Sequence, residues 1–117
     1  MLSKKHRFHG LGSLNYTYRR GMGFRSQSFG IKTTQNRLDT YRVAVVVSKK
    51  VTKKAPNRNR IRRRVYEAVR LTAPKYLTKQ DIIITIFDDR FLETPFAEIQ
   101  QSIEKQFKQI STTNQTV

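Results

Sequence analysis

Two stretches of β-branched residues predict the centre of a small sheet. Residues 41–48 and 81–87 are rich in Val and Ile and are bounded by polar clusters, as buried strands are. Along 41–48 the odd-numbered positions hold Tyr or Val, which predicts one face in the core. The other face is smaller and more polar, which suits the floor of a groove. It consists of Arg42, Ala44, Val46 and Ser48.

Apolar residues spaced three or four apart predict two long helices. The first begins near residue 55, and Pro74 is expected to end it. The second covers 95–110, with Thr94 as its cap and Pro95 at its first helical position. The two core stripes consist of Ile61, Val65, Ala68, Val69 and Thr72, and of Phe96, Ile99, Ile103, Phe107 and Ile110.

Two weaker segments precede these elements. Residues 11–20 predict a short helix with Ser13 as its cap. Residues 24–34 predict a single strand in which Phe29 and Ile31 share one face. The expected order is therefore α-β-β-α-β-α. It indicates an α/β fold of the α+β two-layer sandwich type, a small mixed sheet packed by helices.

The chain has 117 residues, which fits one domain. We expect this domain to cover residues 8–110, with a flexible basic arm at 1–7 and a disordered polar tail at 111–117. The sequence contains no cysteine, which excludes a disulfide framework, and no apolar run long enough to span a membrane. The acid-free N-terminus superficially resembles a mitochondrial transit peptide, but its glycines weaken the amphipathic helix that such a peptide needs. A cytoplasmic protein is expected.

The positive charge of the chain is concentrated in its first part. Residues 1–70 hold 19 Lys and Arg against two acids, a net charge of +17. Residues 71–117 hold five Lys and Arg against six acids, a net charge of −1. A protein that was merely basic and soluble would not be divided in this way. The division favours binding to a polyanion, with nucleic acid ahead of a membrane surface.

The densest positive segment runs from Lys49 to Arg64, with nine basic residues in sixteen and no acid. A solvated basic face is the plainer interpretation, but it leaves the mutual repulsion of these charges uncompensated. Lysine dominates the loop and arginine the helix. The planar guanidinium fork suits phosphate oxygens and stacks on bases, whereas Lys acts as a point charge. This arrangement favours contact with a folded phosphate backbone.

Two other binding modes fit the basic helix less well. A DNA-reading helix-turn-helix needs a second helix close by, and both neighbours of this helix are predicted strands. Binding to a membrane surface needs exposed apolar residues opposite the basic face, and here the core requires those residues. We therefore expect neither DNA nor a membrane as partner.

Aromatic and cationic residues are interspersed near the N-terminus. Such a mixture gives single-stranded bases surfaces on which to stack. Tyr18, on a short polar helix, is the best candidate, whereas Phe24 and Phe29 fit a place in the core equally well. The whole set comprises Phe8, Tyr16, Tyr18, Phe24 and Phe29, with Arg7, Arg19, Arg20 and Arg25.

Residues suited to catalysis are few. His6 lies in the basic arm and His9 just after it, with no carboxylate nearby. Asp88 and Asp89 adjoin the end of a strand, where a turn explains them more simply than a divalent ion. The sequence has no glycine-rich phosphate loop, nucleophile elbow or paired carboxylates. It indicates a binding protein without catalytic residues or a metal site of its own.

Residues 43–70, VAVVVSKKVTKKAPNRNRIRRRVYEAVR, resemble the signature of the bacterial ribonuclease P protein component. That signature is a valine-rich strand, Ser-Lys-Lys, a short loop, and Arg-Asn-Arg opening a basic helix. The likeness covers residues 7–110, with Gly21 and Phe29 at the expected intervals. This chain departs from the family pattern in its loop, which has Thr52 where Gly is usual and is one residue longer.

The resemblance implies a fold and a division of labour. The family fold is an α/β sandwich with a left-handed crossover through the arginine helix, against the usual right-handed rule. Catalysis belongs to an RNA subunit, which uses Mg²⁺ to hydrolyse a phosphodiester and remove the 5′ leader of precursor tRNA. The protein docks on that catalytic RNA and holds the leader in a groove beside its first helix.

The resemblance also assigns residues to these two partners. Residues implied to bind the RNA subunit are Lys49, Lys50, Lys53, Lys54, Arg58, Asn59, Arg60, Arg62 and Arg63. Residues implied to bind the precursor tRNA leader are Leu14, Tyr18, Phe29, Lys32, Arg42 and Ser48. Leu14 and Lys32 stand where the family has aromatic residues, which weakens the stacking expected there.

Two other classes of protein stay open on the sequence. A ribosomal or RNA-chaperone module would bind many RNAs and take no part in processing. A protein-only nuclease would need clustered acids and would cleave without an RNA subunit.

Overall fold

The computed structural model describes residues 4–8 and 11–115. Two 3₁₀ helices and three α-helices accompany four strands within these ranges. In chain order the elements are η1 Lys4–His6, α1 Leu11–Arg20, β1 Met22–Arg25, β2 Phe29–Gln35, β3 Arg42–Val46, α2 Ala55–Tyr76, β4 Gln80–Ile86, η2 Arg90–Leu92 and α3 Phe96–Gln115.

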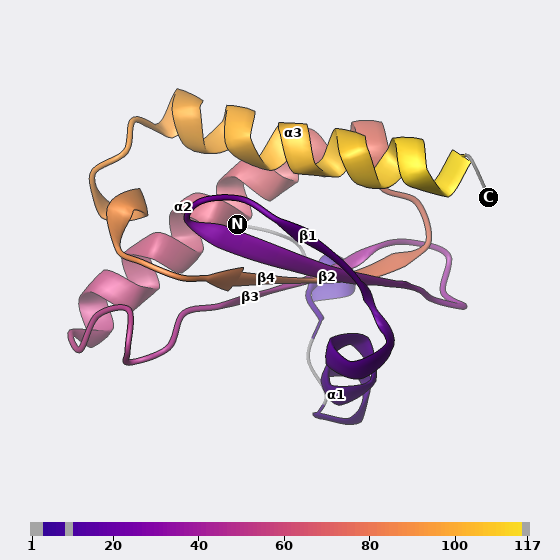
Figure 1. Ribbon diagram of the computed structural model, residues 1–117, viewed down its shortest axis with the longest axis horizontal. Coiled ribbons are helices and arrows are strands. Elements are labelled where there is room, and N and C mark those ends of the chain that lie inside the picture. Colours follow the sequence, from indigo (N-terminus) through magenta and orange to yellow (C-terminus); the bar gives the residue numbers. More distant parts are fainter. Residues whose placement is uncertain (1–3, 9–10, 116–117) are drawn as a thin grey trace.

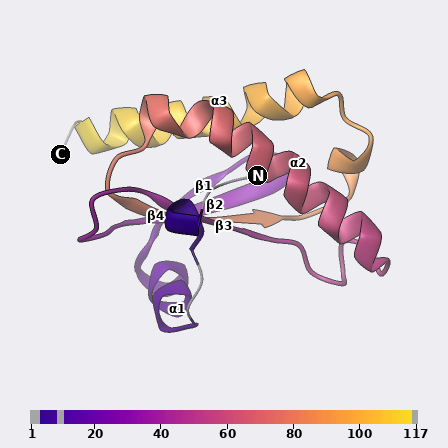
Figure 2. The same cartoon turned by 180° about the vertical axis from the view of Figure 1, so that it is seen from behind.

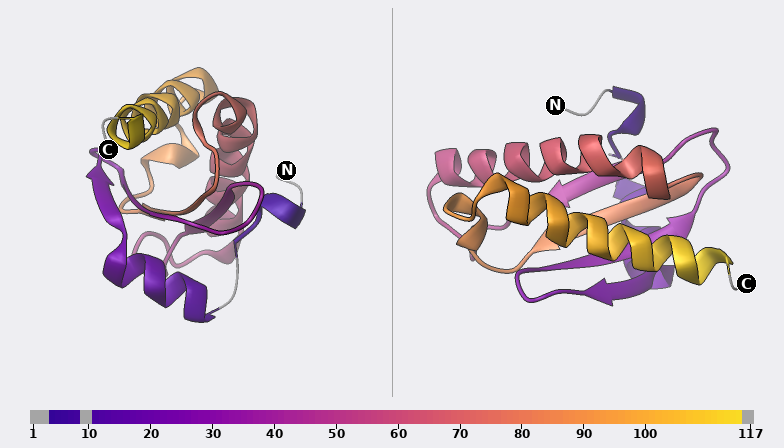
Figure 3. Two further views of the ribbon diagram at one scale, coloured as in Figure 1. Left: turned by 90° about the vertical axis from the view of Figure 1, so that its right-hand side faces the viewer. Right: turned by 90° about the horizontal axis from the view of Figure 1, so that it is seen from above.

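The four strands form one mixed sheet in the order β1-β2-β4-β3. β1 pairs with β2 and β2 with β4 in antiparallel register, whereas β3 and β4 are parallel neighbours joined through α2. Helices α2 and α3 cover one face of the sheet, and α1 lies beneath the other (Figures 1 and 3). The predicted α+β class is therefore confirmed, while the left-handed crossover stays a prediction.

The main core lies between the sheet and the helices α2 and α3. Strands β3 and β4 contribute Val43, Val45, Ile82 and Ile84, which point to the same side because pairing places residues of one face opposite each other. The predicted stripe of α2 is buried throughout. In α3 the stripe from Ile99 to Ile110 is also buried, and Phe96 is partly buried. Both long helices thus pack as their periodicity predicts.

On the opposite face of the sheet, the described residues form a small apolar cluster. It contains Phe8, Ala44 and Ile83, with Leu14 of α1 packed against them. Helix α1 covers this end of the face, and the rest is available for a groove. The predicted two-sided character of β3 is confirmed.

The segment predicted as one strand over 24–34 is instead a hairpin. β1 and β2 are separated by a tight turn in which the backbone N–H of Ser26 donates to the carbonyl of Phe29 at 2.8 Å. The polar residues between Phe24 and Phe29 form this turn. The prediction of a single strand was wrong, and the sheet has one strand more than the sequence suggested.

The described part of the predicted flexible arm is docked. Residues 4–6 form a 3₁₀ helix, and the His6 ring stacks on Tyr41 with centroids 4.1 Å apart. The Phe8 N–H donates to the carbonyl of Val43 at 3.0 Å, so this segment extends the free edge of β3 (Figure 2). Residues 1–3 and 9–10 lie outside the described residues.

Three predicted helix boundaries also differ from the structure. α1 begins at Leu11, so Ser13 lies inside the helix and does not cap it. α2 continues past Pro74 to Tyr76, because a proline in the last turn removes only one hydrogen bond. α3 extends to Gln115, so much of the predicted disordered tail is helical, and residues 116–117 lie outside the described range.

The start of α3 differs from the prediction as well. The Thr94 hydroxyl donates to the carbonyl of Arg90 at 2.8 Å and does not cap α3. The carbonyl of Pro95 accepts the first bonds of the helix, from Glu98 and Ile99. Pro95 is therefore the N-cap residue and not the first helical residue, so the helix begins one residue later than predicted.

Candidate nucleic-acid interface

The loop before α2 and the first half of that helix are rich in exposed basic residues. All nine residues predicted to bind the RNA subunit lie in these two segments, and each is exposed or partly exposed. Among the residues that the structure describes, none of the nine forms an ion pair with an acid. We call this set, Lys49, Lys50, Lys53, Lys54, Arg58, Asn59, Arg60, Arg62 and Arg63, the basic surface.

The start of α2 increases the positive potential of the basic surface. Its first turn contains no acid, and the cap residue Lys54 makes no side-chain cap bond. Helix N-termini attract anions through their unpaired N–H groups and the helix dipole. The positive end of the helix dipole repels the lysine and arginine side chains near it. An anionic partner would reduce this repulsion.

Two residues of the basic surface hold other parts of it in place. Arg58 Nη1 donates to the carbonyls of Thr52 and Lys53, both at 3.0 Å, which closes the lysine loop against the helix. Arg62 donates to the amide oxygen of Asn59 one turn earlier. Arg60 and Arg63 are exposed, and no hydrogen bond to either side chain occurs among the described residues. They are the arginines best placed to reach phosphate groups.

Arg64 follows the basic surface but points into the protein. Its guanidinium donates to the carbonyls of Phe91, Leu92 and Thr94, with the last two bonds at 3.1 and 2.6 Å. Burial, and then the charge of Arg60, lower the pKa of Arg64 below its ordinary value. Arg64 therefore attaches the connection between β4 and α3 to helix α2.

A groove of about 320 Å³ lies on the opposite face of the sheet, beside α1. It includes Tyr18 from the helix and Lys32 from β2, two of the residues predicted to bind the leader. Tyr18 is 39% exposed. We call this site the α1 groove. Its lining residues are Tyr18, Gly23, Phe24, Arg25, Gly30, Ile31, Lys32, Thr85 and Phe87.

The other predicted leader residues have different positions. Leu14 of α1 packs against the small apolar cluster. Ser48 is exposed beyond the end of β3. Phe29 is 1% exposed and packs against Phe91 in the main core, with ring centroids 5.8 Å apart. A ring in that position cannot stack on RNA, so the prediction for Phe29 was wrong. Strand alternation already placed it beside Ile31.

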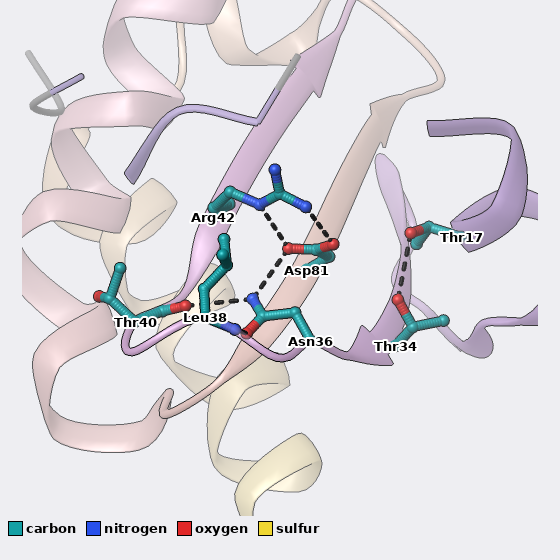
Figure 4. Close-up of polar contacts among 7 residues, drawn as sticks. All are labelled: Thr17, Thr34, Asn36, Leu38, Thr40, Arg42 and Asp81. Atoms are coloured by element: carbon teal, nitrogen blue, oxygen red, sulfur yellow. Dashed lines mark hydrogen bonds and ion pairs between the residues drawn. The ribbon is translucent and has the colours of Figure 1, made fainter. Parts of the chain in front are cut away.

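Arg42 forms an ion pair with Asp81 on the sheet face that α1 covers. Its Nε and Nη2 donate to the two carboxylate oxygens of Asp81, at 2.8 and 2.7 Å. Asn36 Nδ2 donates to the same carboxylate at 2.9 Å, and the Arg42 guanidinium also lies 4.6 Å from the centre of the Phe8 ring. Figure 4 shows Arg42 and Asp81 facing each other from neighbouring strands.

This pairing changes the electrostatics of Arg42. The hydrogen bonds to Asp81 raise the pKa of the guanidinium, against the opposing effect of burial. Because Asp81 neutralises its charge locally, Arg42 is a weaker phosphate ligand than the sequence suggested. Its main role in the structure is to join β3 to β4.

The α1 groove also contains residues that were not predicted to bind the leader. Phe87 and Thr85 line it from the end of β4, and Arg25 lines it from β1. Alternation along 81–87 places Phe87 on the same face as Ile83, away from the main core. This alternation can be read from the sequence, whereas the prediction of a buried strand over 81–87 does not hold for Phe87, which is 40% exposed.

The described residues offer little for catalysis or metal binding. They contain no group of three or more His, Cys, Asp or Glu side chains that could hold a metal ion. Asp88 accepts a bond from the Arg90 N–H at 3.1 Å and pairs with its side chain, as expected of a turn. His6 stacks on Tyr41, and His9 lies outside the described residues. No described helix is long and apolar enough to cross a membrane.

Comparison with known proteins matches both the sequence and the fold. The family model for ribonuclease P matches residues 2–111. The ribonuclease P protein component of Chloroflexus aurantiacus is 36% identical over 101 residues, which are 83% of this chain and 74% of that protein.

Solved structures of bacterial proteins have the same architecture. The RNase P protein of Staphylococcus aureus aligns with a TM-score of 0.73 at 25% identity, over 86% of this chain and 90% of that one. The RNase P protein of Thermotoga maritima aligns with a TM-score of 0.79 at 21% identity, over 88% and 96%, and supports the fold alone. With a family model that matches nearly the whole chain, the protein belongs to the ribonuclease P protein family, whose function is an RNA-binding role in tRNA 5′ maturation.

Proposed function

We propose that this chain docks on a catalytic RNA subunit through the basic surface and holds the 5′ leader of precursor tRNA in the α1 groove. The RNA subunit then hydrolyses the phosphodiester that joins leader and tRNA. The protein contributes binding and charge, and none of its side chains takes part in the chemical step. A cytoplasmic location goes with this proposal and stays a prediction.

One observation supports the proposal above all others: the described residues form two separate cationic surfaces of different chemistry. The basic surface is rich in exposed guanidinium and ammonium groups, which suit the phosphates of a folded RNA. The α1 groove combines Tyr18 with Lys32 and Arg25, which suits stacked bases and phosphates of a single strand. Two surfaces of this kind fit two RNA partners.

Magnesium enters this proposal as a cofactor of the RNA. The described residues bring together no set of ligands for a divalent ion. We therefore propose that the RNA subunit and the substrate hold Mg²⁺ mainly through their own oxygens. The exposed cations of the protein reduce phosphate repulsion between the two RNAs, and so lower the Mg²⁺ concentration that they need.

The assignment of the groove is tested with Tyr18→Ala in the holoenzyme. Loss of one stacking surface should weaken binding of leader-bearing precursor tRNA by about 1–3 kcal/mol. Binding of mature tRNA and assembly with the RNA subunit should hardly change, because Tyr18 is on the face of the sheet away from α2. Equal impairment of substrates with and without a leader would show that the groove does not hold the leader.

A further inference from the structure

One residue that lines the α1 groove is an aromatic side chain with an unusual setting, Phe87. Phe87 follows β4 directly and is 40% exposed, whereas most of the apolar side chains of β4 are buried. It is absent from both apolar clusters of the described residues. Packing within the two apolar clusters therefore does not explain an aromatic ring at this position.

Three contacts position this ring. The Phe87 N–H donates to the carbonyl of Ser28 at 2.8 Å, which fixes the backbone against the β1–β2 turn. The Arg25 guanidinium lies over the ring, 4.7 Å from its centre, in a cation–π arrangement. On the sheet side, the ring lies against Gly30, where an added Cβ would be 2.8 Å from Phe87 Cζ. The glycine thus leaves the space that the ring occupies.

Tyr18 of α1 and Lys32 of β2 line the same groove as this pair. Both aromatic rings are about two-fifths exposed and line the same hollow. Single-stranded RNA requires such a combination, because bases stack on aromatic or guanidinium planes while cations approach the phosphates.

We propose that Arg25 and Phe87 form a second stacking platform in the α1 groove, which binds one unpaired nucleotide of the leader while Tyr18 binds another. This inference rests on the proposed function, since it assumes that the groove holds the leader. The platform consists of Arg25 on β1 and Phe87 directly after β4, with the ring against Gly30 of β2, so its geometry is set by the sheet. Arg25 serves both as part of the stacking surface and as a cation for the adjacent phosphate.

A tryptophan reporter tests the contact directly, because the chain contains no tryptophan. In the reconstituted holoenzyme, Phe87→Trp provides a single indole at the platform, and a base stacked on it quenches its fluorescence. We expect quenching by precursor tRNA with a leader and little change with mature tRNA. Equal quenching by both RNAs, or by neither, would overturn the proposal.

The matched control is Tyr16→Trp. Tyr16 is 58% exposed on the same helix as Tyr18, but it lines a different hollow, with Arg20 and Met22. Its indole should show no leader-dependent quenching. A leader-dependent signal at position 16 equal to that at position 87 would mean that the leader does not select the platform, and would also contradict the proposal.

Substitutions then separate stacking from simple apolar contact. Phe87→Leu keeps an apolar side chain without a ring, and should weaken binding of leader-bearing substrate roughly 5- to 150-fold relative to mature tRNA. Phe87→Tyr should retain most of the affinity. Gly30→Ala, which displaces the ring, should cause part of the same loss and add little to Phe87→Leu, because both changes disrupt one platform.

The outcomes distinguish this inference from the proposed function. If Phe87→Leu binds the leader normally while Tyr18→Ala does not, the platform is refuted and the groove assignment stands. If the unaltered holoenzyme binds leader-bearing and mature tRNA equally, both fail. Equal effects of Phe87→Leu and Phe87→Tyr on leader binding would show that an aromatic ring is not needed at this position, which would also refute the platform.

Discussion

Arg42 and Arg58 were both predicted to bind RNA, and in the structure both guanidinium groups bind other parts of the protein. Arg42 forms a bidentate pair with Asp81, and Arg58 donates to two loop carbonyls. Sequence position alone does not separate such residues from free arginines. What separates them is the presence of acceptors within reach after folding.

At this scale we predict that Asp81→Asn destabilises the fold. The Asp81 carboxylate is buried and accepts three hydrogen bonds, two from Arg42 and one from Asn36. Loss of its charge leaves the partly buried Arg42 guanidinium without a counter-charge, and should lower the free energy of unfolding by about 1–3 kcal/mol. Urea unfolding measures this change.

Asp89→Asn is the control for that experiment. Asp89 is an exposed acid in the loop after β4 and makes no side-chain cap bond. Its replacement should change stability by no more than about 0.5 kcal/mol. If both variants were as stable as the parent chain, Arg42 would be free of a structural role and its place among the leader residues would be restored.

Phe29 and Phe87 show what strand alternation can predict about the candidate site. Phe29 shares a face with Ile31, and that pattern places it correctly in the core. The same rule places Phe87 on the groove face, although composition alone suggests another buried apolar residue. The cation–π contact with Arg25 was not predictable, because it depends on the β1–β2 hairpin, and the sequence pattern predicts a single strand there.

At the scale of the element, helix α2 contains arginines with opposite roles. Arg60 and Arg63 are exposed on the basic surface, whereas Arg64 donates to three carbonyls before α3. Arg60→Ala and Arg63→Ala should each weaken binding to the RNA subunit. In a plot of the logarithm of the binding constant against the logarithm of the salt concentration, each should reduce the magnitude of the slope by about one unit or less. Their free energies of unfolding should change little.

Arg64→Ala is the matched variant on the same helix, with the reverse expectation. It should lower the free energy of unfolding by about 1–3 kcal/mol, since the carbonyls of Phe91, Leu92 and Thr94 lose their donor. The salt slope of RNA binding should stay close to that of the parent chain. If Arg64→Ala reduced the salt dependence of RNA binding and Arg60→Ala reduced the free energy of unfolding, the assignment of Arg60 to RNA binding and of Arg64 to stability would be wrong.

Element types were more predictable than element ends. The stripes of α2 and α3 and the two-sided β3 follow directly from periodicity, because burial of one face is a strong constraint. The hairpin turn at 26–28 and the last turns of α2 and α3 depend on pairing and packing with distant segments. Local sequence alone does not predict those contacts.

For the whole molecule, the decisive feature is the division of charge. The first 70 residues have a net charge of +17, and folding brings these cations closer together than in the unfolded chain. An anion that binds only the folded arrangement stabilises it by mass action, by about 2.7 kcal/mol at a hundredfold excess over Kd. We therefore expect a short single-stranded oligonucleotide to raise the melting temperature clearly.

The control for this effect is chloride at equal ionic strength. Simple screening depends on ionic strength alone, so chloride reports its contribution. An oligonucleotide that raised the melting temperature no more than chloride would show that the basic part of the molecule is not a preformed anion site.

The most direct test of the whole account is precursor tRNA cleavage with purified components. Rigorously RNA-free protein should cleave nothing at any Mg²⁺ concentration. Added to the catalytic RNA subunit, the protein should restore cleavage at low Mg²⁺, where the RNA alone is slow, because its cations offset phosphate repulsion between the two RNAs. Steady cleavage by the protein alone, or no effect of the protein on the Mg²⁺ requirement of the RNA, would contradict the account.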